Sequence, residues 1–226
     1  MKKSLLIFVL ALTAQTIQSQ TVVIGNQTWT TKNLDVTTYS DGTPIPKARN
    51  NEEWANSTTG AWCYFEDLES LGKIHGKLYN WYAVAGIYDE VSKKDISKRK
   101  KLAPEGWHVP SNTEWTTLTT FLGGEKVAGG KMKEKGSEIW ASPNVSATNS
   151  SGFTAIPGSY RYGNVKNQIL NGIFSPSIVE DTYFWSSTEV KMAGTAYARG
   201  LNFTSSVVFK GPLLLSNGLS VRCIKD

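Results

Sequence analysis

The second half of the chain contains only short apolar runs, each separated from the next by glycine, proline or other turn residues. These runs are GFTAIPGSYRYG, DTYFWSSTEV, AYARGLNF, SSVVFK and GLSVRCIK. Runs of this length, rich in aromatic and β-branched residues, are typical of short strands joined by loops. The 226 residues include 8 Trp, 9 Tyr, 8 Phe, 20 Gly and 8 Pro, a composition that disfavours long helical bundles and intrinsic disorder. We therefore expect a loop-rich α+β domain with an aromatic core.

One segment in the middle of the chain has strong signals for a helix. Within residues 110–122, Ser111 is a favourable N-cap and Glu114 follows three residues later, which is the capping-box pattern. Trp115 and Leu118 then recur at helical spacing, and a pair of glycines ends the segment. A second short helix is expected over residues 76–85, where the sequence GKLYNWYAVA is apolar on almost every side.

The first 20 residues are predicted to be a signal peptide. Lys2 and Lys3 form a charged start, Leu5 to Leu12 form a short apolar run, and a polar stretch follows. The run is too short to span a bilayer, and no second run approaches that length. No cysteine follows the run, which argues against a lipid anchor. We expect one domain of residues 21–226, without an integral membrane segment, that is secreted, periplasmic or held at the outer-membrane surface.

The charge of the chain gives little indication of a partner. The formal net charge is +5, and two of the lysines belong to the predicted signal peptide. The remaining excess is mild and has no basic block of consequence, so a nucleic-acid partner is not expected.

Cys63 and Cys223 are the two cysteines of the chain. In an oxidising compartment an even pair most often forms a disulfide, and we predict one between these residues. Two buried, inert thiols are the main alternative, and one reactive thiol is another. Neither cysteine has the CxxC spacing or the adjacent histidine that would favour redox or nucleophilic chemistry.

Candidate metal ligands are few. His75 and His108 lack the HxH or HExxH spacing of a zinc site, and we expect His108 to be packed and His75 to be exposed. Calcium needs several oxygen ligands, and Glu180, Asp181 and Glu189 are one candidate set. A second set is Glu66, Asp67 and Glu69. Because neither set has the dense spacing of a calcium loop, solvated surface carboxylates are the alternative, and no other cofactor is expected.

The loop around Tyr160, Arg161 and Tyr162 is the candidate ligand-binding segment, together with Asn164. Aromatic faces stack on sugar rings or peptide groups, and arginine provides a fixed fork of hydrogen-bond donors. In the alternative interpretation one tyrosine packs inward and Arg161 makes an internal hydrogen-bonded pair.

Several segments, in order, resemble a known family. They are IGNQTWTTKNL, GKLYNWYAV, APEGWHVPSNTEWTTL, GFTAIPGSYRYG, FWSST and GLSVRCIKD, and they extend from about Val23 to Asp226. Together they resemble the Fibrobacter succinogenes major paralogous domain, a family of exported bacterial proteins. That family is similar in outline to C-type lectin-like and formylglycine-generating-enzyme folds. The resemblance implies a single C-type lectin-like domain with two short helices, small antiparallel sheets, long loops, and adjacent N- and C-terminal strands.

The resemblance also implies that long loops on one face form the binding surface. We expect a non-catalytic module that recognises a glycan, a cell-wall polymer or an envelope partner protein. The alternatives are an enzyme on a formylglycine-generating-enzyme-like scaffold and a structural subunit of a cell-envelope assembly. Because such an enzyme needs reactive cysteines near the end of the chain and Cys223 has no second cysteine close by, no enzymatic activity is expected. The ligand and the oligomeric state stay open at this level.

Overall fold

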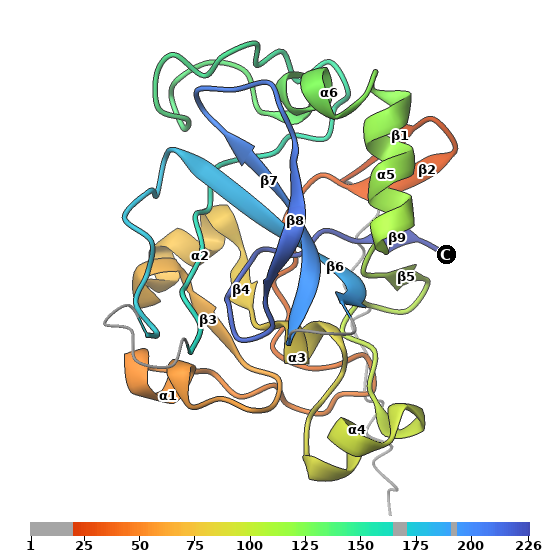
Figure 1. Ribbon diagram of the computed structural model, residues 1–226, viewed down its shortest axis with the longest axis vertical. Coiled ribbons are helices and arrows are strands. Elements are labelled where there is room, and N and C mark those ends of the chain that lie inside the picture. The colour runs from red at the N-terminus through yellow and green to blue at the C-terminus, as the bar shows by residue number, and fades with distance from the viewer. Residues whose placement is uncertain (1–19, 165–170, 191–193) are drawn as a thin grey trace, which may run out of the picture.

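The computed structural model describes residues 20–164, 171–190 and 194–226 (Figure 1). Residues 1–19, and with them nearly all of the predicted signal peptide, lie outside the described residues. The fold is α+β, with short helices, small antiparallel sheets and many loops, as the sequence predicts. Within the described ranges, no helix combines the length and the apolar character needed to cross a membrane.

One sheet brings an early and a late part of the chain together. Its strand order is β1-β2-β9-β5, and Trp29 of β2 pairs with Ile224 of β9. The strands are β1 Thr21–Ile24, β2 Gln27–Thr30, β5 Trp107–His108 and β9 Ile224–Lys225. The expectation that the N- and C-terminal strands are adjacent is therefore confirmed.

A three-stranded sheet occupies the centre of Figure 1 and is here called the central sheet. Its order is β6-β7-β8, with β6 Asp181–Val190, β7 Thr195–Asn202 and β8 Phe209–Leu214. A smaller pair, β3 Trp62–Tyr64 and β4 Lys77–Tyr79, lies to its lower left in that view. The central sheet has the longest strands among the described residues, and it carries much of the candidate site.

The described residues form more helices than the two that were expected. The α-helices are α1 Asn51–Ala55, α2 Glu69–His75, α3 Trp81–Val84, α4 Glu90–Lys94, α5 Asn112–Phe121 and α6 Glu125–Met132. Two short 3₁₀ helices are η2 Phe65–Asp67 and η3 Ile96–Lys98. The additional helices are short, and short segments give too little periodicity for sequence reasoning to detect.

The two predicted helices have different outcomes. The segment 110–122 forms α5, and both halves of its capping box between Ser111 and Glu114 are present. The segment 76–85 divides into β4 and α3, because Asn80 accepts a hydrogen bond from the backbone N–H of Ala83 and starts a new helix. A segment that is apolar on all sides does not distinguish a buried strand from a buried helix.

The central sheet separates two hydrophobic clusters. Phe184 and Trp185 are neighbours on β6, and they point to opposite faces of the sheet and join different clusters. Phe184 packs with Trp29, Trp115 and Phe153, with neighbouring ring centroids 4.8 to 5.9 Å apart. These four fully buried residues are called the buried cluster below.

A buried arginine crosses the edge of this cluster. The Arg222 guanidinium lies 4.7 Å from the ring centroid of Phe153. It donates hydrogen bonds of 2.7 to 3.0 Å to the carbonyl oxygens of Thr30, Phe153 and Thr154 and to the side chain of Asn33. None of these acceptors is a carboxylate, and burial lowers the pKa of Arg222 to about 9. Arg222 therefore joins its own segment to two others, at Thr30 and at Phe153 and Thr154, through their backbone oxygens.

Candidate functional site

Four aromatic side chains form a continuous line beside the central sheet. The ring centroids of Tyr162 and Tyr160 are 4.8 Å apart, those of Tyr160 and Tyr183 5.2 Å, and those of Tyr183 and Phe209 6.0 Å. We call these four residues the aromatic row. Phe209 is 44% exposed and the three tyrosines are half-buried, so the row reaches solvent while its rings support one another edge to face.

The two loop tyrosines lie in a segment whose backbone is held on both sides. On one side, the N–H of Ser175 donates to the carbonyl oxygen of Tyr160, and the N–H of Tyr162 donates to that of Ile173. On the other side, Arg161 and Gly218 exchange two backbone hydrogen bonds of 2.8 and 2.9 Å. The loop is therefore positioned by regular pairing, and ligand binding by Tyr160 and Tyr162 stays a prediction.

The prediction that Arg161 contacts a ligand is wrong. Its side chain is 0% exposed, and it forms an ion pair with Asp67 at 3.2 Å. It also donates to the carbonyl oxygen of Gly172 at 2.6 Å and to the side chain of Asn51 at 3.0 Å. In an extended segment successive side chains point to opposite sides, so the residue between two outward tyrosines points inward. Arg161 holds the loop from below.

Asn164, the fourth predicted residue, is exposed at the end of this loop. Its backbone N–H donates to the Ser216 hydroxyl at 3.0 Å. The backbone is thus anchored, and a contact between the Asn164 side chain and a ligand stays a prediction.

Tyr183 and Phe209 are the residues of the row that sequence reasoning missed. Both pair with Gly200 across the central sheet, Tyr183 from β6 and Phe209 from β8. Alternation along DTYFW could have separated Tyr183 from its inward neighbour Phe184. The loop tyrosines precede Tyr183 by roughly twenty residues, and no local signal shows that they lie against this part of the sheet.

The predicted calcium set of Glu180, Asp181 and Glu189 does not form. Asp181 begins β6 and Glu189 lies near its other end, which places them roughly 25 Å apart at the usual rise of a strand. Among the residues that the structure describes, no group of three or more His, Cys, Asp or Glu side chains could hold a metal ion.

Asp181 instead lies buried at the edge of the aromatic row. The residue is 8% exposed, and its Oδ1 atom has no hydrogen-bond partner among the described residues. Burial, with a smaller effect from the charge of Glu180, raises the pKa of Asp181 to about 7. Burial and the nearby Asp181 charge also raise the pKa of Tyr183. The carboxyl group is therefore uncharged in mildly acidic solution.

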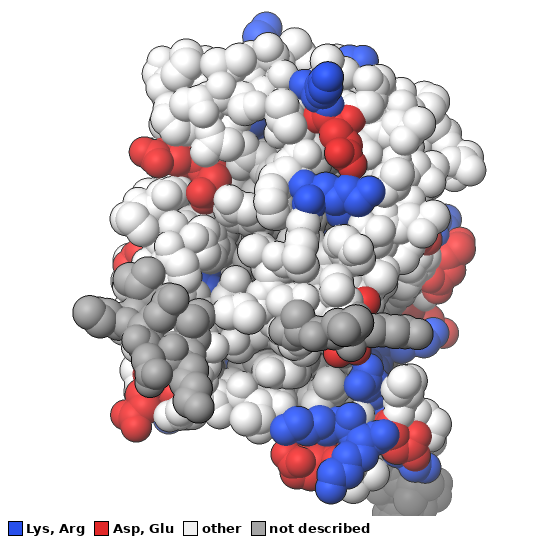
Figure 2. Space-filling model, in the orientation of Figure 1, with Lys and Arg blue, Asp and Glu red and all other residues white. Residues whose placement is uncertain are grey.

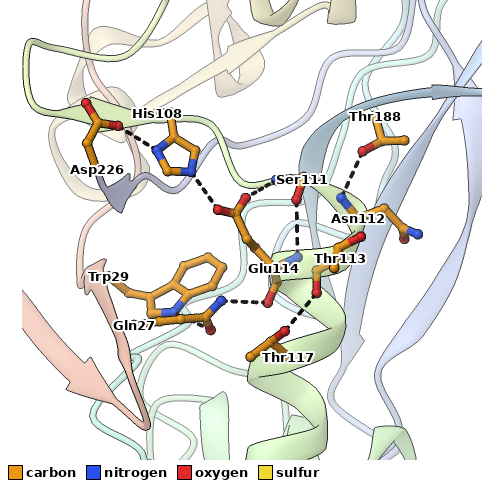
Figure 3. A network of polar contacts seen from close by, with 10 residues as sticks. All are labelled: Gln27, Trp29, His108, Ser111, Asn112, Thr113, Glu114, Thr117, Thr188 and Asp226. Carbon is orange, nitrogen blue, oxygen red and sulfur yellow. Dashed lines mark hydrogen bonds and ion pairs between the residues drawn. The ribbon is translucent and has the colours of Figure 1, made fainter.

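His108 lies between two carboxylates, in the network drawn in Figure 3. Its Nδ1 atom is 2.7 Å from Oδ1 of Asp226, and its Nε2 atom is 2.8 Å from Oε1 of Glu114. Burial lowers the pKa of His108, but the two carboxylates outweigh burial and raise it above 6.5. Because each ring nitrogen faces a different carboxylate, the three side chains do not converge on one point where a metal ion could bind.

The same network borders the buried cluster. The second oxygen of Glu114 accepts from the backbone N–H of Ser111 at 2.7 Å. Gln27 donates to the carbonyl oxygen of Glu114 and accepts from the indole N–H of Trp29. An open polar hollow of about 400 Å³ lies beside it, lined by Asn26, Gln27, Thr28, Glu114, Thr117, Ile224, Lys225 and Asp226. The polar groups of the network are thus used to join β2, β5, β9 and α5.

The predicted disulfide is wrong. Cys63 and Cys223 are free, buried thiols. Cys63 packs in a cluster with Trp54 and Phe65, whereas Cys223 belongs to the cluster on the Trp185 side of the central sheet. Burial raises the pKa of each thiol to about 12. They match the alternative of two buried, inert thiols. The disulfide prediction failed because an even count of cysteines does not by itself bring the side chains together.

These features define an α+β domain of short elements whose candidate site is an aromatic surface. The chain belongs to the Fibrobacter succinogenes major domain family, whose model matches residues 22–225. The family resemblance of the sequence segments is therefore confirmed. No curated protein and no solved structure matches the chain.

Proposed function

We propose that this protein is an exported, non-catalytic module that binds a glycan or a cell-wall polymer through the aromatic row. The aromatic row is the observation that supports the proposal, because its four neighbouring rings reach solvent along one line. Aromatic faces stack on the C–H surfaces of sugar rings, and tyrosine hydroxyls can bond to sugar hydroxyls. An envelope partner protein that docks on the same surface is the alternative.

The buried groups beneath the row support a binding role. Arg161 is fully buried and bonded to three separate segments, so the loop that carries Tyr160 and Tyr162 has its conformation before a ligand arrives. A surface that is already ordered loses less conformational entropy on binding. Export is supported by the charged and apolar start of the sequence.

The titratable groups described above favour binding over catalysis. Both ring nitrogens of His108 are engaged by carboxylates, so neither is free to take a proton from a substrate. The two thiols are buried and have raised pKa values, which disfavours the nucleophilic thiolate.

The proposal is tested by a glycan array together with retention on insoluble cellulose, chitin and peptidoglycan. Tyr160→Ala and Tyr162→Ala are each expected to weaken binding about tenfold, the typical loss of one stacking ring. Their Tm values should stay within about 4 °C of the wild type. Tyr197→Ala is the matched control, because Tyr197 is a half-buried tyrosine on the opposite face of the central sheet.

Two results would overturn the proposal. The first is folded wild-type protein that binds none of the glycans or polymers. The second is binding that both loop variants retain at full strength. If no glycan bound but a purified envelope protein bound in a Tyr162-dependent manner, the partner-protein alternative would replace the glycan.

A further inference from the structure

The register of the central sheet brings two rings of the aromatic row onto a strip of glycine. Tyr183 pairs with Gly200, and Gly200 pairs with Phe209. Two residues further along, and so on the same face, Gly211 of β8 pairs with Ala198. Paired residues of an antiparallel sheet share a face, so the two glycines lie beneath the two rings.

The glycines are required by space and not by backbone conformation. Neither Gly200 nor Gly211 has a positive φ. A Cβ atom at Gly200 would lie 2.6 Å from Cε1 of Tyr183, and one at Gly211 would lie 2.6 Å from Cζ of Phe209. Real Cβ atoms do not approach so closely, so each ring lies low on the sheet only because no side chain is beneath it.

The two rings together form a corner that is open to solvent. Their planes cross at 75° with centroids 6.0 Å apart, and Phe209 is 44% exposed. A flat, hydroxyl-bearing ring can place one C–H face on one aromatic ring and an edge against the other. We call Tyr183 and Phe209, with Gly200 and Gly211 beneath them, the aromatic corner.

The surroundings of the corner favour an uncharged ligand. Among positions 181–185 of β6 and their partners on this face, Asp181 is the one acidic residue and none is Lys or Arg. Lys210, the neighbour of Phe209, points to the other face of the sheet, where it forms an ion pair with Glu125 at 3.6 Å. Figure 2 shows much of the visible surface without charged side chains and the densest charged group near α4, at the foot of the view. A strongly acidic or basic polymer would find no complementary charge here.

Hydroxyl groups distinguish this surface from a purely apolar docking patch. Three of the four rings of the aromatic row are tyrosines. Tyr160 packs against Tyr183 of the corner, and Tyr162 packs against Tyr160. Hydroxyl-rich ligands need such donors and acceptors beside the apolar stacking surface.

We propose that the aromatic corner holds one uncharged pyranose ring of a glycan, with the two loop tyrosines contacting the next sugar. Gly200 and Gly211 act as positioning residues, because they let Tyr183 and Phe209 lie against the sheet. This inference rests on the proposed function and adds to it the class of sugar and the residues that hold the first ring.

Gly211→Ala and Gly200→Ala test the inference, because each keeps every aromatic ring and every charge but lifts one ring from the sheet. Affinity electrophoresis would use hydroxyethyl cellulose and dextran as neutral polymers and polygalacturonate as an acidic one. One of the neutral polymers is expected to retard the wild type. Both variants should bind that polymer at least tenfold more weakly than the wild type does. Lys210→Ala is the matched control on the other face of β8, and its binding should be unchanged.

Phe209→Leu gives a second test if an alanine variant does not fold, because it keeps an apolar side chain and removes the ring. It should also bind about tenfold more weakly while circular dichroism stays native. If folded Gly211→Ala and Phe209→Leu both retained neutral-polymer binding, the role of the aromatic corner would be overturned, but the proposed function would stand. Wild-type binding to polygalacturonate alone would overturn the neutral class, and wild-type binding to no glycan would overturn the proposed function itself.

Discussion

The buried cluster and the aromatic row each contain four aromatic rings, and they meet at adjacent residues of β6. Phe184 belongs to the buried cluster and its neighbour Tyr183 to the aromatic row. Ring spacing is similar in both, at 4.8 to 5.9 Å in the cluster and 4.8 to 6.0 Å in the row. The difference is exposure, since every ring of the cluster is fully buried and every ring of the row reaches solvent.

This difference separates two roles for the same kind of side chain. Full burial of a large apolar side chain contributes about 1.5 to 3 kcal/mol to folding, so the cluster serves stability. The rings of the row keep part of that surface unburied, and that surface is available to a ligand. Trp185 lies on the same face of β6 as Tyr183 and is fully buried, so the exposure of a ring, and not its residue type, decides which role it has.

The largest expected effect comes from the two neighbours on β6. Phe184→Ala should reduce the free energy of unfolding by about 3 to 5 kcal/mol, because it removes a fully buried ring and leaves a cavity. Tyr183→Ala should reduce it by only about 1 kcal/mol and should weaken glycan binding. Urea unfolding and affinity electrophoresis of both variants measure this. Equal losses of stability would show that the distinction between the two regions is wrong.

A second effect concerns the arginine at the edge of the buried cluster. Arg222→Lys should cost about 2 to 3 kcal/mol, because an ammonium group cannot reach the four acceptors that the guanidinium fork satisfies. Arg99→Lys is the control, since Arg99 is half-buried and its side chain donates to a single carbonyl oxygen, that of Ser92. Both are compared by urea unfolding, and similar losses would contradict a special role for Arg222.

A smaller effect is the pH dependence of the polar network beside the cluster. The pKa of His108 is raised above 6.5, so its contribution is fully present below pH 6.5 and is lost as the pH rises through the raised value. Between pH 6 and pH 9 the Tm of the wild type should therefore fall by about 2 °C more than the Tm of His108→Gln. A wild-type-like slope in the variant would exclude His108 as the source.

The other histidine provides an internal control. Burial lowers the pKa of His75 and outweighs the hydrogen bond to the carbonyl oxygen of Pro157. In a proton NMR titration the two histidine signals should therefore change on opposite sides of pH 6.5, and His75→Gln assigns them. Both signals below pH 6.5 would contradict the ion pairs of His108.

An effect as small as that of His108 belongs to the carboxyl group beside the aromatic row. The pKa of Asp181 is about 7 in the folded chain against an ordinary value of 3.8, so the folded state binds more protons between these values and stability falls as the pH rises through them. Asp181→Asn should thus raise Tm by about 2 °C at pH 8 and change it little at pH 4. A lower Tm at pH 8 would show that the ionised carboxylate is stabilised.

Parts of this picture could be predicted from sequence because their signals are local. The helix α5 was predicted because its capping box and the spacing of its apolar residues lie within about a dozen positions. The inward position of Arg161 was available as an alternative, since alternation sets it opposite its tyrosine neighbours. The complete aromatic row was not predictable, because it depends on pairing between the loop, β6 and β8. The disulfide was wrong for the same reason, because contact between Cys63 and Cys223 is a property of tertiary packing.

Because the two thiols lie apart, their reaction rates can report how the interior of the protein opens. Cys63 and Cys223 lie in different hydrophobic clusters and no covalent bond connects them. A thiol reagent in solution can reach each sulfur only during an opening of the interior around it. Equal modification rates would indicate that the interior opens as one cooperative unit. Unequal rates would indicate that its parts open independently, with one part released while the other stays closed.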